Sequence, residues 1–134
     1  DPDSFDFSFS GLKSHVLNYL NRAEMKGETV NTADVAASFQ KALFDVLAQK
    51  AVNACKAKGI DRLVLSGGVA ANHTLREMIT ALAAPENIRF HYPPKTLCTD
   101  NAAMIGAVAY YKYLRGEFNS SSLNATANIP LENE

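Results

Sequence analysis

The alternation of apolar and polar residues changes period along the chain, and each period predicts a different element. Phenylalanine alternates with polar residues at positions 5–9, which is the period-2 pattern of a strand with one buried face. Between Leu12 and about Lys26 the apolar residues recur every three or four positions, which predicts a helix that Gly27 ends. The N-terminal part is therefore expected to be a strand followed by a helix.

The longest element is predicted at residues 32–58, where the helical spacing of apolar residues is sustained throughout. Asn31 or Thr32 is expected to cap its N-terminus, and Gly59 stands just past its end. At ~1.5 Å per residue this helix is about 40 Å long, enough to cross a whole domain.

The next segments follow the order of a βαβ unit. The run at 62–66 holds three consecutive branched apolar residues and predicts a parallel strand buried on both faces. A helix at 72–84, stopped by Pro85, separates it from a second strand at 88–92. The last helix is predicted at 100–115, and its many small residues imply close packing against a sheet or another helix.

The resulting fold is α/β, with a short, mainly parallel sheet and flanking helices. The predicted strands are too few for the number of helices, so we expect the chain to be the C-terminal part of a larger protein. Within it, residues 1–116 are expected to form one lobe and residues 117–134 a polar tail.

Composition narrows the class of protein further. The chain has 134 residues, of which 47% are hydrophobic, and a net charge of −1, so any contact with RNA must be local. Cys55 and Cys98 have no C-x-x-C spacing, and no apolar run approaches the ~20 residues that span a bilayer. These features predict a reduced cytoplasmic protein without membrane contact.

A glycine pair follows the first parallel strand and carries the first candidate chemistry. Gly67 and Gly68 remove two side chains where the strand ends, and Asn72 begins the next helix. Backbone N–H groups and the helix dipole at such a turn can receive an anion such as phosphate. From the residues alone, an ordinary tight strand–helix turn stays open as the alternative.

The second candidate is Asp100, at the start of the last predicted helix. An acid there is commonly a cap or a dipole partner. In a parallel sheet, however, the helix starts after successive strands lie at the same carboxyl edge, where ligands bind. Asn72 and Asp100 are therefore expected to converge on a site that suits a phosphate and a metal ion.

Three segments together resemble the signatures of one family. They are FSFSGLK at 7–13, LSGGVAAN at 65–72 and CTDNAAMI at 98–105. All three resemble, in the expected order, segments of the TsaD family, the bacterial tRNA N6-adenosine threonylcarbamoyltransferases, formerly described as O-sialoglycoprotein endopeptidases. The resemblance spans about residues 5–115 and is specific as a combination, whereas each motif alone is not.

The resemblance implies a two-lobed ATPase fold like those of actin, Hsp70 and sugar kinases, with this chain as most of the C-terminal lobe. It implies transfer of threonylcarbamoyl from threonylcarbamoyl-AMP to N6 of the adenosine beside the anticodon of ANN-decoding tRNAs. Asn72, Gly67 and Gly68 would bind the nucleotide-like substrate, and Asp100 would be a ligand of one divalent metal, iron or alternatively zinc. The implied partners are tRNA and the subunits TsaB and TsaE.

The chain also departs from the family pattern. The other two metal ligands of the family come from a His-x-x-x-His helix in the N-terminal lobe, and His15, His73 and His91 lack that spacing. Since metal sites usually need three or four protein ligands, the chain alone is expected to be inactive and to retain no stoichiometric metal. No side chain is assigned a catalytic role, and Cys98 has no placed triad partner.

Three other functions remain as alternatives at this stage. A related kinase or ATPase lobe would share the glycine turn, but the string at 98–105 disfavours it. A non-catalytic partner subunit of the same fold should have lost the glycine pair or the acid. A metalloprotease would need a motif such as H-E-x-x-H, which the chain lacks.

Overall fold

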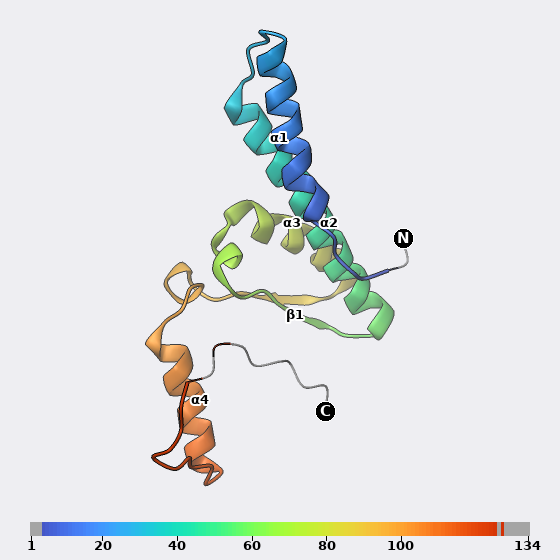
Figure 1. The fold of residues 1–134 in the computed structure, drawn as a ribbon. Helices are drawn as coiled ribbons and strands as arrows, with labels where there is room; N and C mark the ends of the chain where they lie inside the picture. Colours follow the sequence, from blue (N-terminus) through green and yellow to red (C-terminus); the bar gives the residue numbers. More distant parts are fainter. Residues whose placement is uncertain (1–3, 126, 128–134) are drawn as a thin grey trace. The chain divides into compact units, whose positions relative to one another are not determined.

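The computed structural model describes residues 4–125 and 127, in two compact units (Figure 1). One unit ends at Thr99 and the other begins at Asp100. The first contains, in order, α1 (Ser10–Met25), α2 (Thr32–Lys58), β1 (Arg62–Val64), the 3₁₀ turn η1 (Gly68–Ala71), α3 (His73–Ala83), the 3₁₀ turn η2 (Ala84–Glu86), β2 (Arg89–His91) and the 3₁₀ turn η3 (Lys95–Leu97). The second contains α4 (Ala102–Leu114).

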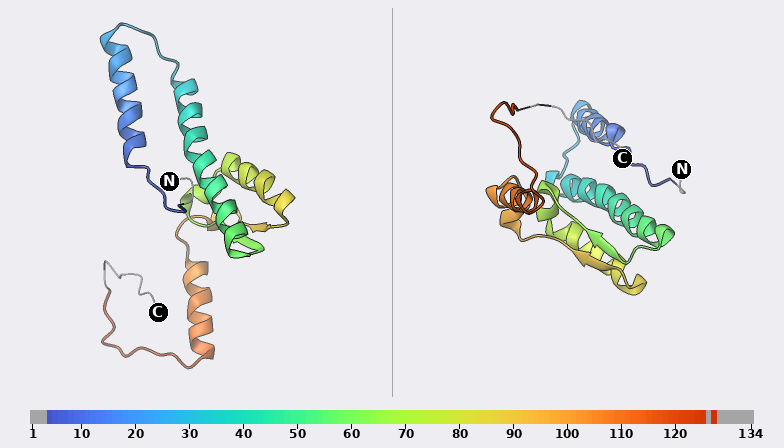
Figure 2. Two further views of the ribbon diagram at one scale, coloured as in Figure 1. Left: turned by 90° about the vertical axis from the view of Figure 1, so that its right-hand side faces the viewer. Right: turned by 90° about the horizontal axis from the view of Figure 1, so that it is seen from below.

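The limits of α2 agree with the predicted ones because local caps set them. The side-chain oxygen of Asn31 accepts a hydrogen bond from the N–H of Ala33 at 3.0 Å, so Asn31, rather than Thr32, is the N-cap. Gly59 ends the helix in the left-handed conformation, with φ of 64°. Gly27 likewise follows α1 with φ of 69°, and α1 and α2 form an antiparallel pair (Figure 2).

The predicted strands at 62–66 and 88–92 are confirmed as β1 and β2, which form a parallel two-stranded sheet. Leu63 pairs with Phe90, so both side chains point to the same face, and this face packs on α2 and α3. Val64 lies on the opposite face and is 69% exposed. The predicted burial on both faces is therefore wrong, because both covering helices lie on one side.

An ion pair supports the start of the sheet. The N–H of Arg89 donates to the backbone oxygen of Asp61 at 2.8 Å, and its guanidinium binds the Asp61 carboxylate. The hydrogen bond from Arg89 lowers the pKa of this exposed carboxyl below its ordinary value. Its contribution to stability is therefore present at neutral pH and is lost as the pH falls through the lowered pKa.

The core lies where α2 and α3 meet over the sheet. Leu75 and Ile79 of α3 are 2% and 3% exposed, and they pack with Phe44 and Ala48 of α2. A second buried cluster continues this contact toward the end of α2. The apolar spacing of the two helices thus produces a single packed layer against the sheet.

The strand predicted at residues 5–9 is wrong. The sheet of the described residues consists of β1 and β2, and these residues pair with neither strand. They run as an irregular segment in which the rings of Phe7 and Phe9 stack at 5.9 Å. Lys50 donates a hydrogen bond to the backbone oxygen of Asp6 at 2.6 Å. A period-2 pattern forms a strand only where a neighbouring strand satisfies its backbone groups.

The close packing expected of the last helix is also not observed. Within the described residues α4 contains no buried residue, and Ile105 is 69% exposed. The rest of its own unit, as far as it is described, forms no helix or strand against which α4 could pack. None of the described helices combines the length and apolarity needed to cross a bilayer.

Replacing Leu75 by alanine should lower the free energy of unfolding by about 2–5 kcal/mol, because it leaves a cavity between α2, α3 and the sheet. Leu17→Ala is the matched control, since Leu17 is 50% exposed on α1 and should change stability much less. Urea denaturation of both variants measures the difference. Equal losses in the two variants would show that the α2–α3 contact is not the core.

Candidate functional site

The two glycines after β1 differ in why the structure needs them. Gly67 has φ of 87° and ψ of 175°, a conformation that strains any residue with a side chain. Gly68 does not have such a positive φ, and a Cβ added to it would meet no atom within 4 Å. The conformation therefore explains Gly67, whereas neither strain nor crowding among the described residues explains Gly68.

Asn72 caps the helix predicted at 72–84, which the structure places at α3 after the unpredicted 3₁₀ turn η1. Its side-chain oxygen accepts a hydrogen bond from the N–H of Leu75 at 3.3 Å. Its amide nitrogen donates to the side-chain oxygen of Gln40 on α2 at 3.0 Å, and Gln40 in turn donates to Thr74 at 3.4 Å. Two helices thus hold the Asn72 amide in one orientation.

Arg76 is a residue that the sequence analysis missed. Its Nε donates to the backbone oxygen of Ala70, and its Nη2 donates to that of Pro93 at 3.0 Å. Nη2 also lies 3.3 Å from Sγ of Cys98, and the guanidinium lies over the ring of Tyr92 at 4.2 Å from its centroid. A single sequence could not have predicted these contacts. The acceptors are backbone carbonyls, which every residue has, so no particular residue type marks the partner of Arg76.

Cys98 is only 3% exposed, at the end of the loop that follows β2. Its sulfur lies 3.4 Å from the backbone oxygen of Pro94, to which the thiol can donate. Enclosed by this carbonyl and by Arg76, Cys98 contributes to packing. That Cys98 has no nucleophilic role stays a prediction.

Asp100 is exposed and lies one position before the helix cap. Asn101 is the N-cap of α4, and its side-chain oxygen accepts a hydrogen bond from the N–H of Met104 at 3.1 Å. Asn101, and not Asp100, is therefore the cap of α4, so the capping alternative for Asp100 does not apply. Asn72 and Asp100 belong to different units, so their convergence on one site stays a prediction.

The donor set of the described residues does not by itself form a metal site. Among them, no three side chains of His, Cys, Asp or Glu lie together in a group that could hold a metal ion. His73 forms a pair with Glu77 at 3.1 Å on the surface of α3. A metal held by Asp100 would therefore need further ligands from outside the described residues.

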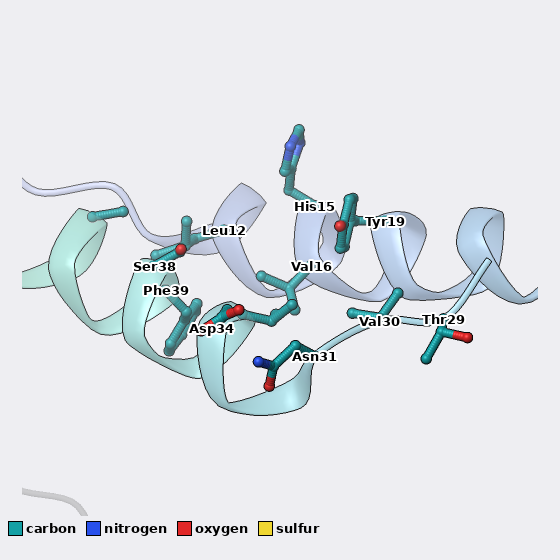
Figure 3. A pocket seen from close by; sticks show the side chains of 12 residues that line it. Leu12, His15, Val16, Tyr19, Thr29, Val30, Asn31, Asp34, Ser38 and Phe39 are labelled. Atoms are coloured by element: carbon teal, nitrogen blue, oxygen red, sulfur yellow. The ribbon is translucent and has the colours of Figure 1, made fainter.

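A groove between α1 and α2 is separate from these residues (Figure 3). It has a volume of about 430 Å³, and its walls are mainly apolar, with Val16 on one helix and Phe39 on the other. His15 lies at this groove. Gly67, Gly68, Asn72 and Asp100 are absent from its walls, so it is not the predicted substrate site.

Comparison with known proteins identifies the class and then the family. The parallel β1–α3–β2 unit with its glycine turn is an α/β architecture. The model of the TsaD family, tRNA N6-adenosine threonylcarbamoyltransferase, matches residues 2–107. The chain belongs to the TsaD family, which confirms the resemblance carried by its three motifs.

Several relatives are named tRNA N6-adenosine threonylcarbamoyltransferase. The chain is 53% identical to the relative from Clostridium botulinum strain 657 over 129 aligned residues. The alignment covers 96% of this chain and 38% of the relative. It is 54% identical to the relative from Clostridioides difficile strain 630 over 131 aligned residues. This alignment covers 98% of this chain and 39% of the relative. The chain thus spans about two fifths of the length of these relatives.

Gly67→Ala should cost about 1 kcal/mol or more of stability, because alanine is strained at a φ of 87°. Gly68→Ala should leave stability unchanged or slightly raised, since the added Cβ meets open space. Thermal unfolding of the two neighbouring variants checks this. A larger loss in Gly68→Ala would mean that the turn has a different conformation.

Proposed function

We propose that the protein to which this chain belongs is a tRNA N6-adenosine threonylcarbamoyltransferase. It transfers the threonylcarbamoyl group from threonylcarbamoyl-AMP to N6 of the adenosine beside the anticodon in ANN-decoding tRNAs. The observation that carries the proposal is the family match over residues 2–107, together with 53% identity to a transferase of that name. Because the chain spans 38% of that relative, the activity is proposed for the whole protein.

In this proposal the chain is most of the C-terminal lobe of an actin-like, two-lobed ATPase fold. Gly67 and Gly68 let the phosphate and ribose of the substrate approach the backbone, and Asn72 contacts the nucleotide. Two observations support these roles. The backbone conformation does not require glycine at position 68. The Asn72 amide is held in place by hydrogen bonds to two helices. Backbone N–H groups at such a turn suit phosphate oxygens.

Asp100 is proposed as one ligand of a divalent metal, iron or alternatively zinc. A carboxylate oxygen suits either ion, and the exposure of Asp100 leaves its side chain accessible to further ligands. The chain by itself is proposed to be inactive, because the described residues bring no second and third ligand to such a site.

The proposed partners are tRNA and the subunits TsaB and TsaE, and the proposed location is the cytoplasm. These follow from the family to which the chain belongs. The net charge of −1 gives the chain no general attraction to nucleic acid, so tRNA contacts would depend on local groups.

In the full-length protein, Gly68→Ala should weaken the binding of AMP, the nucleotide that the transfer would leave, by about tenfold or more, because its Cβ occupies space that the ligand needs. Calorimetric titration with AMP measures the affinity. Gly106→Ala is the matched control, since its Cβ also meets no atom within 4 Å. Unchanged affinity in a folded Gly68→Ala variant would place the nucleotide elsewhere.

Asp100→Ala in the full-length protein should abolish tRNA modification and remove the metal, with little change in melting temperature because Asn101 provides the cap. The assay supplies threonylcarbamoyl-AMP, an ANN-decoding tRNA and the proposed partner subunits TsaB and TsaE, and detects the modified adenosine by mass spectrometry. Metal content is measured on the same samples.

Two controls make this assay decisive. Asp45→Ala removes an exposed carboxylate that pairs with Lys41 and should keep both metal and activity. A tRNA with guanosine in place of the target adenosine should stay unmodified. No modification by the unaltered protein would reject the proposed function, whereas normal metal content in Asp100→Ala would reject only the ligand role.

A further inference from the structure

One side chain connects the two loops that follow the parallel strands. Arg76 donates hydrogen bonds to the backbone oxygen of Ala70 after β1 and to that of Pro93 after β2. The same guanidinium contacts Sγ of Cys98 and the ring of Tyr92. All of these groups lie in the first unit.

The position of Arg76 on α3 is electrostatically unfavourable by itself. It is the fourth residue of the helix, and a cation near a helix N-terminus opposes the helix dipole. The side chain is also half-buried, so its charge needs hydrogen-bonding partners. The two carbonyls and the aromatic face supply them, which means that Arg76 is stabilised by the loops that it joins.

The first loop carries residues of the proposed site, and the second ends two residues before Asp100 in the sequence. Ala70, which is fully buried, comes two residues after Gly68, and Cys98 comes two residues before Asp100. The neighbouring Leu75 is 2% exposed in the core, so the backbone from which Arg76 extends is held in place. A guanidinium anchored in this way fixes the separation of the two loops.

We infer that Arg76 is a positioning residue for the nucleotide site, because it links the glycine turn to the loop ending at Cys98. This inference rests on the proposed transferase function. It differs from a role in stability alone, because loss of the link should change ligand binding in a protein that remains folded. Arg76 itself need not touch the substrate.

The test uses Arg76→Gln and Arg76→Lys in the full-length protein. Glutamine has one donor nitrogen on a shorter side chain in place of Nε and Nη2, and it lacks the charge that faces Tyr92. Lysine keeps the charge but not the planar fork. Arg89→Gln is the matched control, because Arg89 forms an exposed pair with Asp61 away from both loops. Each variant is examined for AMP affinity, kcat and KM of tRNA modification, thermal unfolding and hydrogen exchange.

In Arg76→Gln, the dissociation constant for AMP should rise and kcat should fall by about tenfold or more, with an unchanged KM for tRNA. Arg76→Lys should be intermediate, and Arg89→Gln should match the unaltered protein in AMP affinity and kcat. Hydrogen exchange should accelerate at the amides of both loops, represented by Ala70 and Cys98, while the middle of α2 keeps its protection. Both of these amides are hydrogen-bonded in the structure, at 3.0 and 3.2 Å.

Unchanged AMP affinity and kcat in folded Arg76→Gln would overturn the inference. Losses of affinity and kcat that are fully accounted for by the fraction of unfolded protein would also overturn it. Unchanged exchange in either loop would overturn the link between them, whatever the activity. If the unaltered protein neither binds AMP nor modifies tRNA, the proposed function fails. The exchange result then still decides whether Arg76 joins the loops.

Discussion

The packing of α2 against α3 over one face of a two-stranded sheet is the constraint on which the first unit depends. Two strands alone cannot form a stable sheet in water, so β1 and β2 require this apolar cover. Leu75 and Ile79 provide it from α3, and Phe44 and Ala48 from α2. Full burial of a large apolar side chain contributes about 1.5–3 kcal/mol, so this contact outweighs the single hydrogen bonds around it.

The polar contacts of the site derive their geometry from this core. Since Leu75 fixes the rotation of α3, Asn72 at its start faces Gln40 of α2, and Arg76 extends toward the loops after the strands. A hydrogen bond positions a group well only when its partner is rigid, and here the partners stand on packed helices or on short turns. The glycine turn can therefore be positioned without a side chain of its own.

The apolar residues outside this core behave differently. Val64 on the open face of the sheet and Ile105 on α4 are both 69% exposed. The irregular segment at 5–9 likewise keeps Phe7 47% exposed. Their sequence patterns are those of buried surfaces, but a pattern states only that a face is apolar, and its cover must come from another element. None of these three features has such a cover within its own unit, as far as that unit is described.

Properties that depend on neighbouring residues were readable from the sequence. The limits of α2 follow from Asn31 and Gly59, which act on backbone groups beside them. The family follows from three motifs, each of which is a continuous run of residues. Features that depend on distant segments were decided only by tertiary structure: the exposure of Val64, the irregular course of residues 5–9, and the link from Arg76 to Ala70 and Pro93. The physical reason is that periodicity and caps record local geometry, whereas burial and the choice of a carbonyl acceptor depend on which surfaces the packed helices bring together.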